Sequence, residues 1–125
     1  MINESWEYYK EVYKDMISLA QYQSAAAKTA MYKHNHKILY PALGLAGEAG
    51  EVANKVKKML RDDNLDKNAI ASEIGDVLWY AAMLSKDLNI ELHDVAIQKL
   101  AAISVNFERH FMRRSISFKR ASAPL

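Results

Sequence analysis

Helix breakers are scarce in this sequence. Its 125 residues include only two prolines and four glycines, and no stretch alternates apolar and polar residues for long enough to predict a β-strand. Alanine, leucine, lysine, glutamate and methionine, which favour helices, are prominent. Because half of the residues are apolar or aromatic, the chain can bury a core and is not expected to be disordered. The sequence therefore predicts an all-α fold.

Four main helices joined by short loops are expected. They cover about residues 4–32 (with a break near Ser18 as an alternative), 41–61, 66–88 and 92–113. Pro41 suits the first turn of a helix, where its missing N–H is not needed, and Asp66 suits an N-cap. Residues 34–36 and 62–64 are expected to form loops or turns. Because helices joined by short loops pack as antiparallel neighbours, we expect a four-helix bundle.

Length and charge limit the classes of protein to consider. We expect one domain over residues 1–114 and a loosely attached basic tail over residues 115–125, since five basic and no acidic residues follow Glu108. A net charge of +2 does not predict binding to nucleic acid or to a membrane. The sequence has no cysteine, no signal-peptide pattern and no apolar run long enough to span a bilayer. A cytoplasmic protein is therefore expected.

Two pairs of carboxylates, Glu48 with Glu51 and Glu73 with Asp76, each stand three residues apart. At about 100° per residue, the members of a pair lie about 60° apart on one face of a helix. Apolar residues share the face of the second pair: Val77, Met83 and Leu84. Burying unpaired carboxylates costs several kcal/mol per ion, so this pattern predicts that cations neutralise them.

Carboxylate oxygens are the ligands that magnesium (Mg2+) or manganese (Mn2+) prefers. No Glu-x-x-His occurs in the chain, so a ferritin-like di-iron site lacks its histidines. The four glycines stand beside the carboxylates, inside the expected helices, where each costs about 1 kcal/mol relative to alanine. They are expected to leave room for metal and phosphate or to permit close helix packing: Gly44, Gly47, Gly50 and Gly75. Room for metal and phosphate is the favoured explanation for Gly47 and Gly75. For Gly44 and Gly50 both explanations stay open.

The run from Leu43 to Lys58, followed by Glu73-Ile74-Gly75-Asp76-Val77-Leu78-Trp79-Tyr80, closely resembles the MazG-like nucleotide pyrophosphohydrolases. The family pattern is Glu-x-x-Glu, a spacer and Glu-x-x-Asp, and here 21 residues separate Glu51 from Glu73. The resemblance extends from about Tyr22 to Leu100. A single Glu-x-x-Glu is common on helices, whereas both pairs in this order with the surrounding residues form a specific pattern.

The resemblance implies magnesium-dependent hydrolysis of a (deoxy)nucleoside triphosphate to the monophosphate and pyrophosphate, by a homodimer or homotetramer. It implies that Glu48, Glu51, Glu73 and Asp76 bind Mg2+, with Mn2+ as an alternative, and that Glu48 or Glu51 is the general base. It also implies that Tyr80 and Lys99 contact the nucleotide or its phosphates. Gln23 and Tyr32 would contact the base.

Two lysines, Lys55 and Lys58, continue the helix face of Glu51. They are candidates for phosphate contacts, and the alternative is a solvated face on which they pair with Glu51 and Asn54. The fourth helix departs from the family pattern, because Ala96 replaces a frequent asparagine and the residues after Leu100 match no known family ending. Asn106 or Arg113 could replace the missing phosphate contacts, which is a hypothesis.

Two other functions stay open at this point. One is a non-catalytic helical bundle that senses nucleotides or has a structural role, and the other is a specialised dUTP hydrolase of the same superfamily. Retention of all four carboxylates favours the enzyme, because a structural bundle has no need for them. The base, and whether the sugar is ribose or deoxyribose, cannot be predicted from the sequence.

Overall fold

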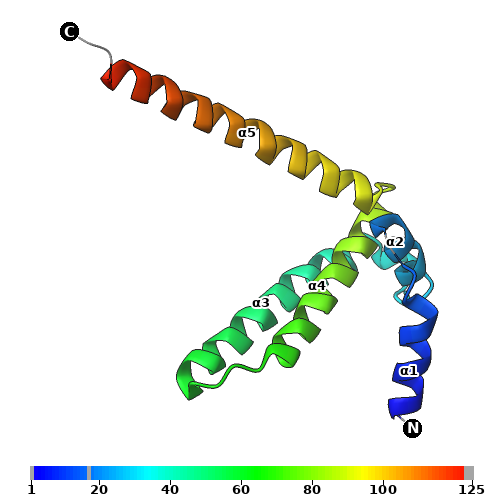
Figure 1. The fold of residues 1–125 in the computed structure, drawn as a ribbon. Coiled ribbons are helices and arrows are strands. Elements are labelled where there is room, and N and C mark those ends of the chain that lie inside the picture. The colour runs from blue at the N-terminus through cyan, green and yellow to red at the C-terminus, as the bar shows by residue number, and fades with distance from the viewer. Residues whose placement is uncertain (1, 17, 123–125) are drawn as a thin grey trace. The chain divides into compact units, whose positions relative to one another are not determined.

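The computed structural model describes residues 2–16 and 18–122, and the side chains of residues 7–16 and 18–122. Within these residues it has five α-helices, one short 3-10 helix and no strand (Figure 1). The helices are α1 (Ile2–Tyr13), α2 (Leu19–Ala27), η1 (His34–His36), α3 (Leu39–Asp62), α4 (Lys67–Asp87) and α5 (Leu92–Ala121). The all-α prediction is confirmed, and five α-helices stand where four main helices were expected.

The difference lies in the first quarter of the chain, where one expected helix is two. Ser18 is the N-cap of α2: its hydroxyl accepts the N–H of Gln21 at 3.1 Å, and the Gln21 side chain accepts the N–H of Ser18 at 3.1 Å. This reciprocal capping box starts a new helix, which confirms the alternative of a break near Ser18. The expected helix end at Tyr32 is wrong, because α2 ends at Ala27. Residues 34–36, expected as a loop, form η1.

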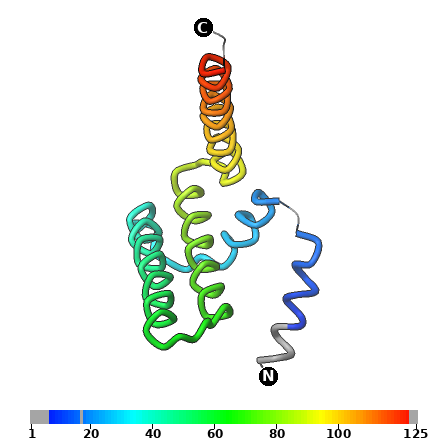
Figure 2. The backbone as a smooth tube through the Cα atoms, turned by 60° about the vertical axis from the view of Figure 1, so that its left-hand side comes forward, coloured from blue at the N-terminus to red at the C-terminus, as the bar shows by residue number. Residues whose placement is uncertain are grey.

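Helices α3 and α4 form an antiparallel hairpin and run side by side in both views (Figures 1 and 2). Pro41 lies in the first turn of α3 and is buried. Asp63 ends α3 with a left-handed φ of 48°, and the Asp66 carboxylate accepts the N–H of Ala69 at 3.0 Å. The turn after α3 and the N-cap of α4 therefore stand where the sequence predicted them.

Helix α2 packs against α4 around a small core. Its buried apolar members are Ala26, Ala82, Met83 and Leu92. Gln23 is also buried and joins three backbone groups: its Nε2 donates to the carbonyls of Ala82 (3.3 Å) and Ile90 (3.0 Å), and its Oε1 accepts the N–H of Leu92 (3.0 Å). This side chain fixes α2 to the end of α4 and to the residue that starts α5.

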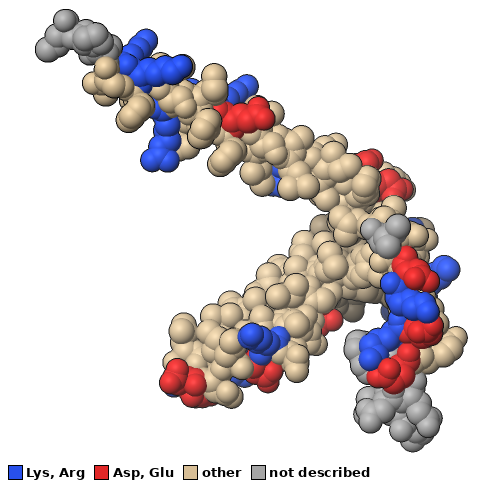
Figure 3. All heavy atoms as spheres, viewed as in Figure 1, with Lys and Arg blue, Asp and Glu red and all other residues tan. Residues whose placement is uncertain are grey.

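The chain divides into two compact units, one up to Leu92 and one from His93 onward. In the second unit α5 continues to Ala121, so its expected end near Arg113 is wrong. Residues 114–121 contain neither proline nor glycine, and so nothing in them ends the helix. Several basic side chains of α5 lie near its C-terminal end (Figure 3). The division into a domain of residues 1–114 and a tail stays a prediction.

Among the described residues, no helix combines the length and the apolar character that crossing a bilayer requires.

Candidate metal centre

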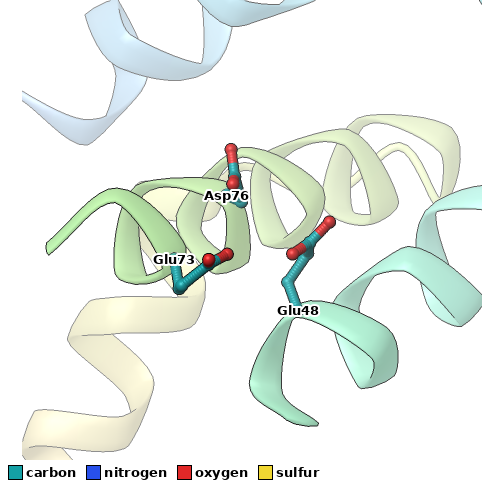
Figure 4. Close-up of side chains that lie close together, drawn as sticks. All are labelled: Glu48, Glu73 and Asp76. Atoms are coloured by element: carbon teal, nitrogen blue, oxygen red, sulfur yellow. The ribbon is translucent and has the colours of Figure 1, made fainter. Parts of the chain in front are cut away.

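Three of the four predicted metal ligands converge. Glu48 extends from α3 toward α4, and Glu73 and Asp76 stand on α4 opposite to it (Figure 4). One carboxylate oxygen from each of the three lies within 4.8 Å of the others. The packing of α3 on α4 thus brings the two sequence pairs together, with one residue from the first pair and both from the second.

The spacing of these oxygens fits a divalent cation. A protein ligand lies about 2.0–2.1 Å from Mg2+, so two oxygens that share the ion are at most about 4.2 Å apart. Small side-chain rotations would bring three oxygens that lie within 4.8 Å of one another into this range. The donor set consists of carboxylates alone, which suits Mg2+ or Mn2+ better than a softer metal.

The negative charges of this cluster repel one another. The pKa of Glu48 is raised, first by desolvation and then by the negative charges of Asp76, Glu73 and Glu51 and a hydrogen bond with Glu73. The Lys55 ammonium lies 3.6 Å from Oε1 of Glu73 and supplies a positive charge beside the cluster. A raised pKa means that the ionised carboxylate is disfavoured, and a bound cation would stabilise this ionised form.

The carboxylates are less buried than the apolar stripe predicted. Glu48 and Glu73 are half-buried, whereas Glu51 and Asp76 are exposed. The expectation of a buried second pair is therefore wrong for Asp76. Among the described residues, the main packing contacts between helices are those of α4 with α3 and with α2. Two packed helices cover only the faces that they turn to each other, so the other faces of α3 and α4 stay exposed. Asp76 is nevertheless close enough to Tyr22 of α2 for its negative charge to contribute to the raised pKa of Tyr22, after desolvation by burial.

Glu51 lies one turn beyond Glu48 and outside the group of three. Its Oε1 accepts a hydrogen bond from Nδ2 of Asn54 at 3.3 Å. Its charge still contributes to the raised pKa of Glu48. The structure therefore separates Glu51 from the other three carboxylates, a distinction that the spacing of the motif does not contain.

Tyr80 borders the cluster and packs on a glycine. A Cβ built on Gly44 would stand 2.5 Å from Cδ1 and from Cζ of Tyr80, and closer still to Cε1. Gly44 therefore permits close packing of α3 on α4. Apart from the adjacent residues and the backbone of its own helix, a Cβ at Gly47, Gly50 or Gly75 would meet no atom within 4 Å. The pKa of Tyr80 is raised by burial, by a hydrogen bond with the Tyr40 hydroxyl and by neighbouring charges, those of Glu48 and Asp76 included.

Tyr32 and Gln23, the predicted base contacts, both hold parts of the fold together. The Tyr32 hydroxyl donates to Oδ2 of Asp87 at 2.8 Å, and the same oxygen accepts the N–H of Ile38 at 3.0 Å. Ile38 has a φ of 68°, which is strained for a β-branched residue. The sequence offered no sign of this role for Asp87. Gln23 uses both amide hydrogens on backbone carbonyls. Contact of either side chain with a base stays a prediction.

The predicted phosphate-binding lysines fall into two groups. Lys55 and Lys58 line one cavity of about 220 Å³ near the turn of the hairpin, with Met59, Asp62, Asn64, Asp66 and Ala69. Lys99 is exposed on α5 in the second unit, as are Asn106 and Arg113. The roles of these three residues stay predictions.

Comparison with known proteins identifies the family of this chain. The family described as MazG nucleotide pyrophosphohydrolase domain matches residues 35–104. This chain belongs to that family. The matched MazG segment contains all four carboxylates, Tyr80 and the three candidate lysines, and it excludes Gln23 and Tyr32.

The chain is also similar to a curated phage protein. The MazG chain is similar to the Gene 37 protein of Mycobacterium phage L5, with 36% identity over 105 residues, which cover 75% of this chain and 92% of the relative. No solved structure matches the chain significantly.

Proposed function

We propose that this MazG-family chain hydrolyses a (deoxy)nucleoside triphosphate to the monophosphate and pyrophosphate, with Mg2+ as its cofactor. The observation that carries the proposal is the convergence of Glu48, Glu73 and Asp76 from two helices. These residues occupy the positions of the paired carboxylates in a chain whose family is a nucleotide pyrophosphohydrolase family. Mutually repelling carboxylates without a catalytic or binding role would only destabilise the hairpin.

The four carboxylates have different roles in this proposal. Glu48, Glu73 and Asp76 hold the cation, for which Mn2+ is an alternative to Mg2+. A divalent cation at such a site draws charge from phosphate oxygens and lowers the pKa of water. Glu51, which lies outside the group of three and is exposed, is positioned to act as the general base or as a fourth ligand. As the base, its carboxylate accepts a proton from the water that attacks the α-phosphorus. The bond between the α-phosphorus and the oxygen that bridges it to the β-phosphorus breaks, and pyrophosphate leaves.

The remaining predicted residues form the substrate-binding part of the proposal. Lys55 and Lys58 line one cavity and suit the β- and γ-phosphates, and Tyr80 borders the carboxylates. Lys99, Gln23 and Tyr32 are proposed as further substrate contacts. We propose that the protein is a homodimer or homotetramer built on a helical bundle, because the exposed Glu51 and Asp76 leave the site open on one side. We also propose that it is located in the cytoplasm.

The test is a panel of the eight common nucleoside triphosphates and dUTP, each incubated with the protein and Mg2+. Pyrophosphate should be released from at least one of them. Glu48→Gln and Asp76→Asn should abolish the release, because each removes a charged ligand. Glu108→Gln is the matched control, since this carboxylate is exposed on α5, and its activity should equal that of the wild type.

The panel also separates the alternatives. Preferential cleavage of dUTP would identify a specialised dUTP hydrolase. Binding of a nucleotide without release of pyrophosphate would indicate a sensor, and the absence of both would indicate a structural bundle. Either of the last two results would refute the proposed enzyme.

A further inference from the structure

Lys55 makes an ion pair unlike the others between described residues. Its ammonium lies 3.6 Å from Oε1 of Glu73 and joins α3 to α4, and the two side chains are 34% and 16% exposed. The other pairs join residues at most three positions apart, and every partner in them is at least 46% exposed. Exposed pairs of that kind contribute little, whereas a partly buried pair across two helices is less screened by solvent.

The partner of Lys55 is itself one of the converging carboxylates. Glu73 contributes an oxygen to the group with Glu48 and Asp76, and it is hydrogen-bonded to Glu48. The carboxylate of Glu73 is therefore the partner of the Lys55 ammonium and also a proposed ligand for the divalent cation. Two positive charges at one carboxylate repel each other, so each weakens the binding of the other.

We infer that Lys55 is a tethered counter-ion that competes with the divalent cation for Glu73, and so lowers the affinity of the protein for the cation alone. The inference rests on the proposed function, since it assigns Lys55 a part in the same metal centre. Lys55 stabilises the carboxylates when no cation is bound and weakens cation binding by the same interaction.

Lys55 lies beside both Glu73 and a cavity that could hold phosphate. Its four-carbon side chain is flexible, and the same residue lines the cavity of about 220 Å³ together with Lys58. An ammonium that a cation has displaced from Glu73 stays close to that cavity, where an anionic phosphate can pair with it. A cation that arrives with a phosphate chain then binds better than the cation alone. Lys55 thus favours the metal–nucleotide complex over free metal.

The experiment measures cation affinity without nucleotide. Mg2+ is titrated by isothermal titration calorimetry into the wild type, Lys55→Gln and Lys57→Gln. Lys57 is exposed on the same helix and points about 200° away from Lys55, so this control makes the same change of net charge without touching Glu73. Lys55→Arg keeps the charge and should stay near the wild type.

Lys55→Gln should bind Mg2+ about fivefold more tightly than Lys57→Gln. This factor corresponds to about 1 kcal/mol, the Coulomb energy of two unit charges 4 Å apart in water. Without Mg2+, Lys55→Gln should also unfold at a lower temperature than Lys57→Gln, because Glu73 loses its partner.

Equal or weaker Mg2+ binding by Lys55→Gln, with normal binding by the wild type, overturns the competition and leaves the proposed function intact. If Mg2+ neither binds to nor stabilises the wild type, the metal centre itself is refuted, and the inference falls with it.

Discussion

Gly44→Ala is the substitution for which the structure and helix propensity predict opposite results. In a helix interior, alanine is favoured over glycine by about 1 kcal/mol, so propensity alone predicts a more stable protein. The structure predicts a clash, because the new Cβ would stand 2.5 Å from two ring carbons of Tyr80. The ring has little freedom to withdraw, since it packs edge-on against Trp79 at 5.1 Å and is hydrogen-bonded to Tyr40.

The magnitude follows from these two effects. Forcing extra atoms into a packed contact costs about 1–3 kcal/mol, and the gain in propensity offsets about 1 kcal/mol of this. We therefore expect Gly44→Ala to lower the free energy of unfolding by about 0–2 kcal/mol. Gly50→Ala is the matched control on the same helix, because its new Cβ would meet no atom within 4 Å apart from the adjacent residues and the backbone of α3. It should stabilise the protein by about 1 kcal/mol.

The assay is urea denaturation of the metal-free protein, followed by far-ultraviolet circular dichroism at two protein concentrations. The difference between the two variants is the decisive quantity, since the propensity gain cancels and about 1–3 kcal/mol of overpacking remains. Replacing Tyr80 by leucine should remove this difference. If Gly44→Ala stabilises the protein as much as Gly50→Ala does, Tyr80 does not pack on Gly44 and the reasoning about this contact is wrong.

Two other substitutions test the contacts that hold the fold together. Tyr32→Phe should cost about 1 kcal/mol at neutral pH, because the hydrogen bond to Asp87 is lost. Burial and Asp87 raise the pKa of Tyr32 above its usual 10.0, so its contribution is complete below pH 10 and is lost as the pH rises further. The difference from the wild type in chemical denaturation should therefore shrink above pH 10, and a constant difference would contradict the assignment. Gln23→Met should cost about 3 kcal/mol, since it leaves backbone groups of Ile90 and Leu92 without their partner, and a loss below about 1 kcal/mol in the same assay would show that water replaces the amide.

The sequence by itself determined the features that depend on neighbouring residues. The scarcity of breakers predicted helices, Asp66 predicted the start of α4, and Ser18 predicted the break before α2. A cap or a turn acts through atoms a few residues away, so a short stretch contains all the information it needs. The paired carboxylates also lie within three residues of each other, and their order along the chain was enough to identify the MazG family.

Only the tertiary structure decided which of these residues meet. The rotation of α3 about its axis brings Glu48 to Glu73 and Asp76, leaves Glu51 outside and places Lys55 beside Glu73. The bonds of Gln23 to Leu92 and of Tyr32 to Asp87 span 69 and 55 residues. Such contacts depend on how whole helices pack, and periodicity within one helix says which residues share a face but not what that face meets. The four carboxylates were therefore predictable as a set, and their division into a group of three and one separate residue was not.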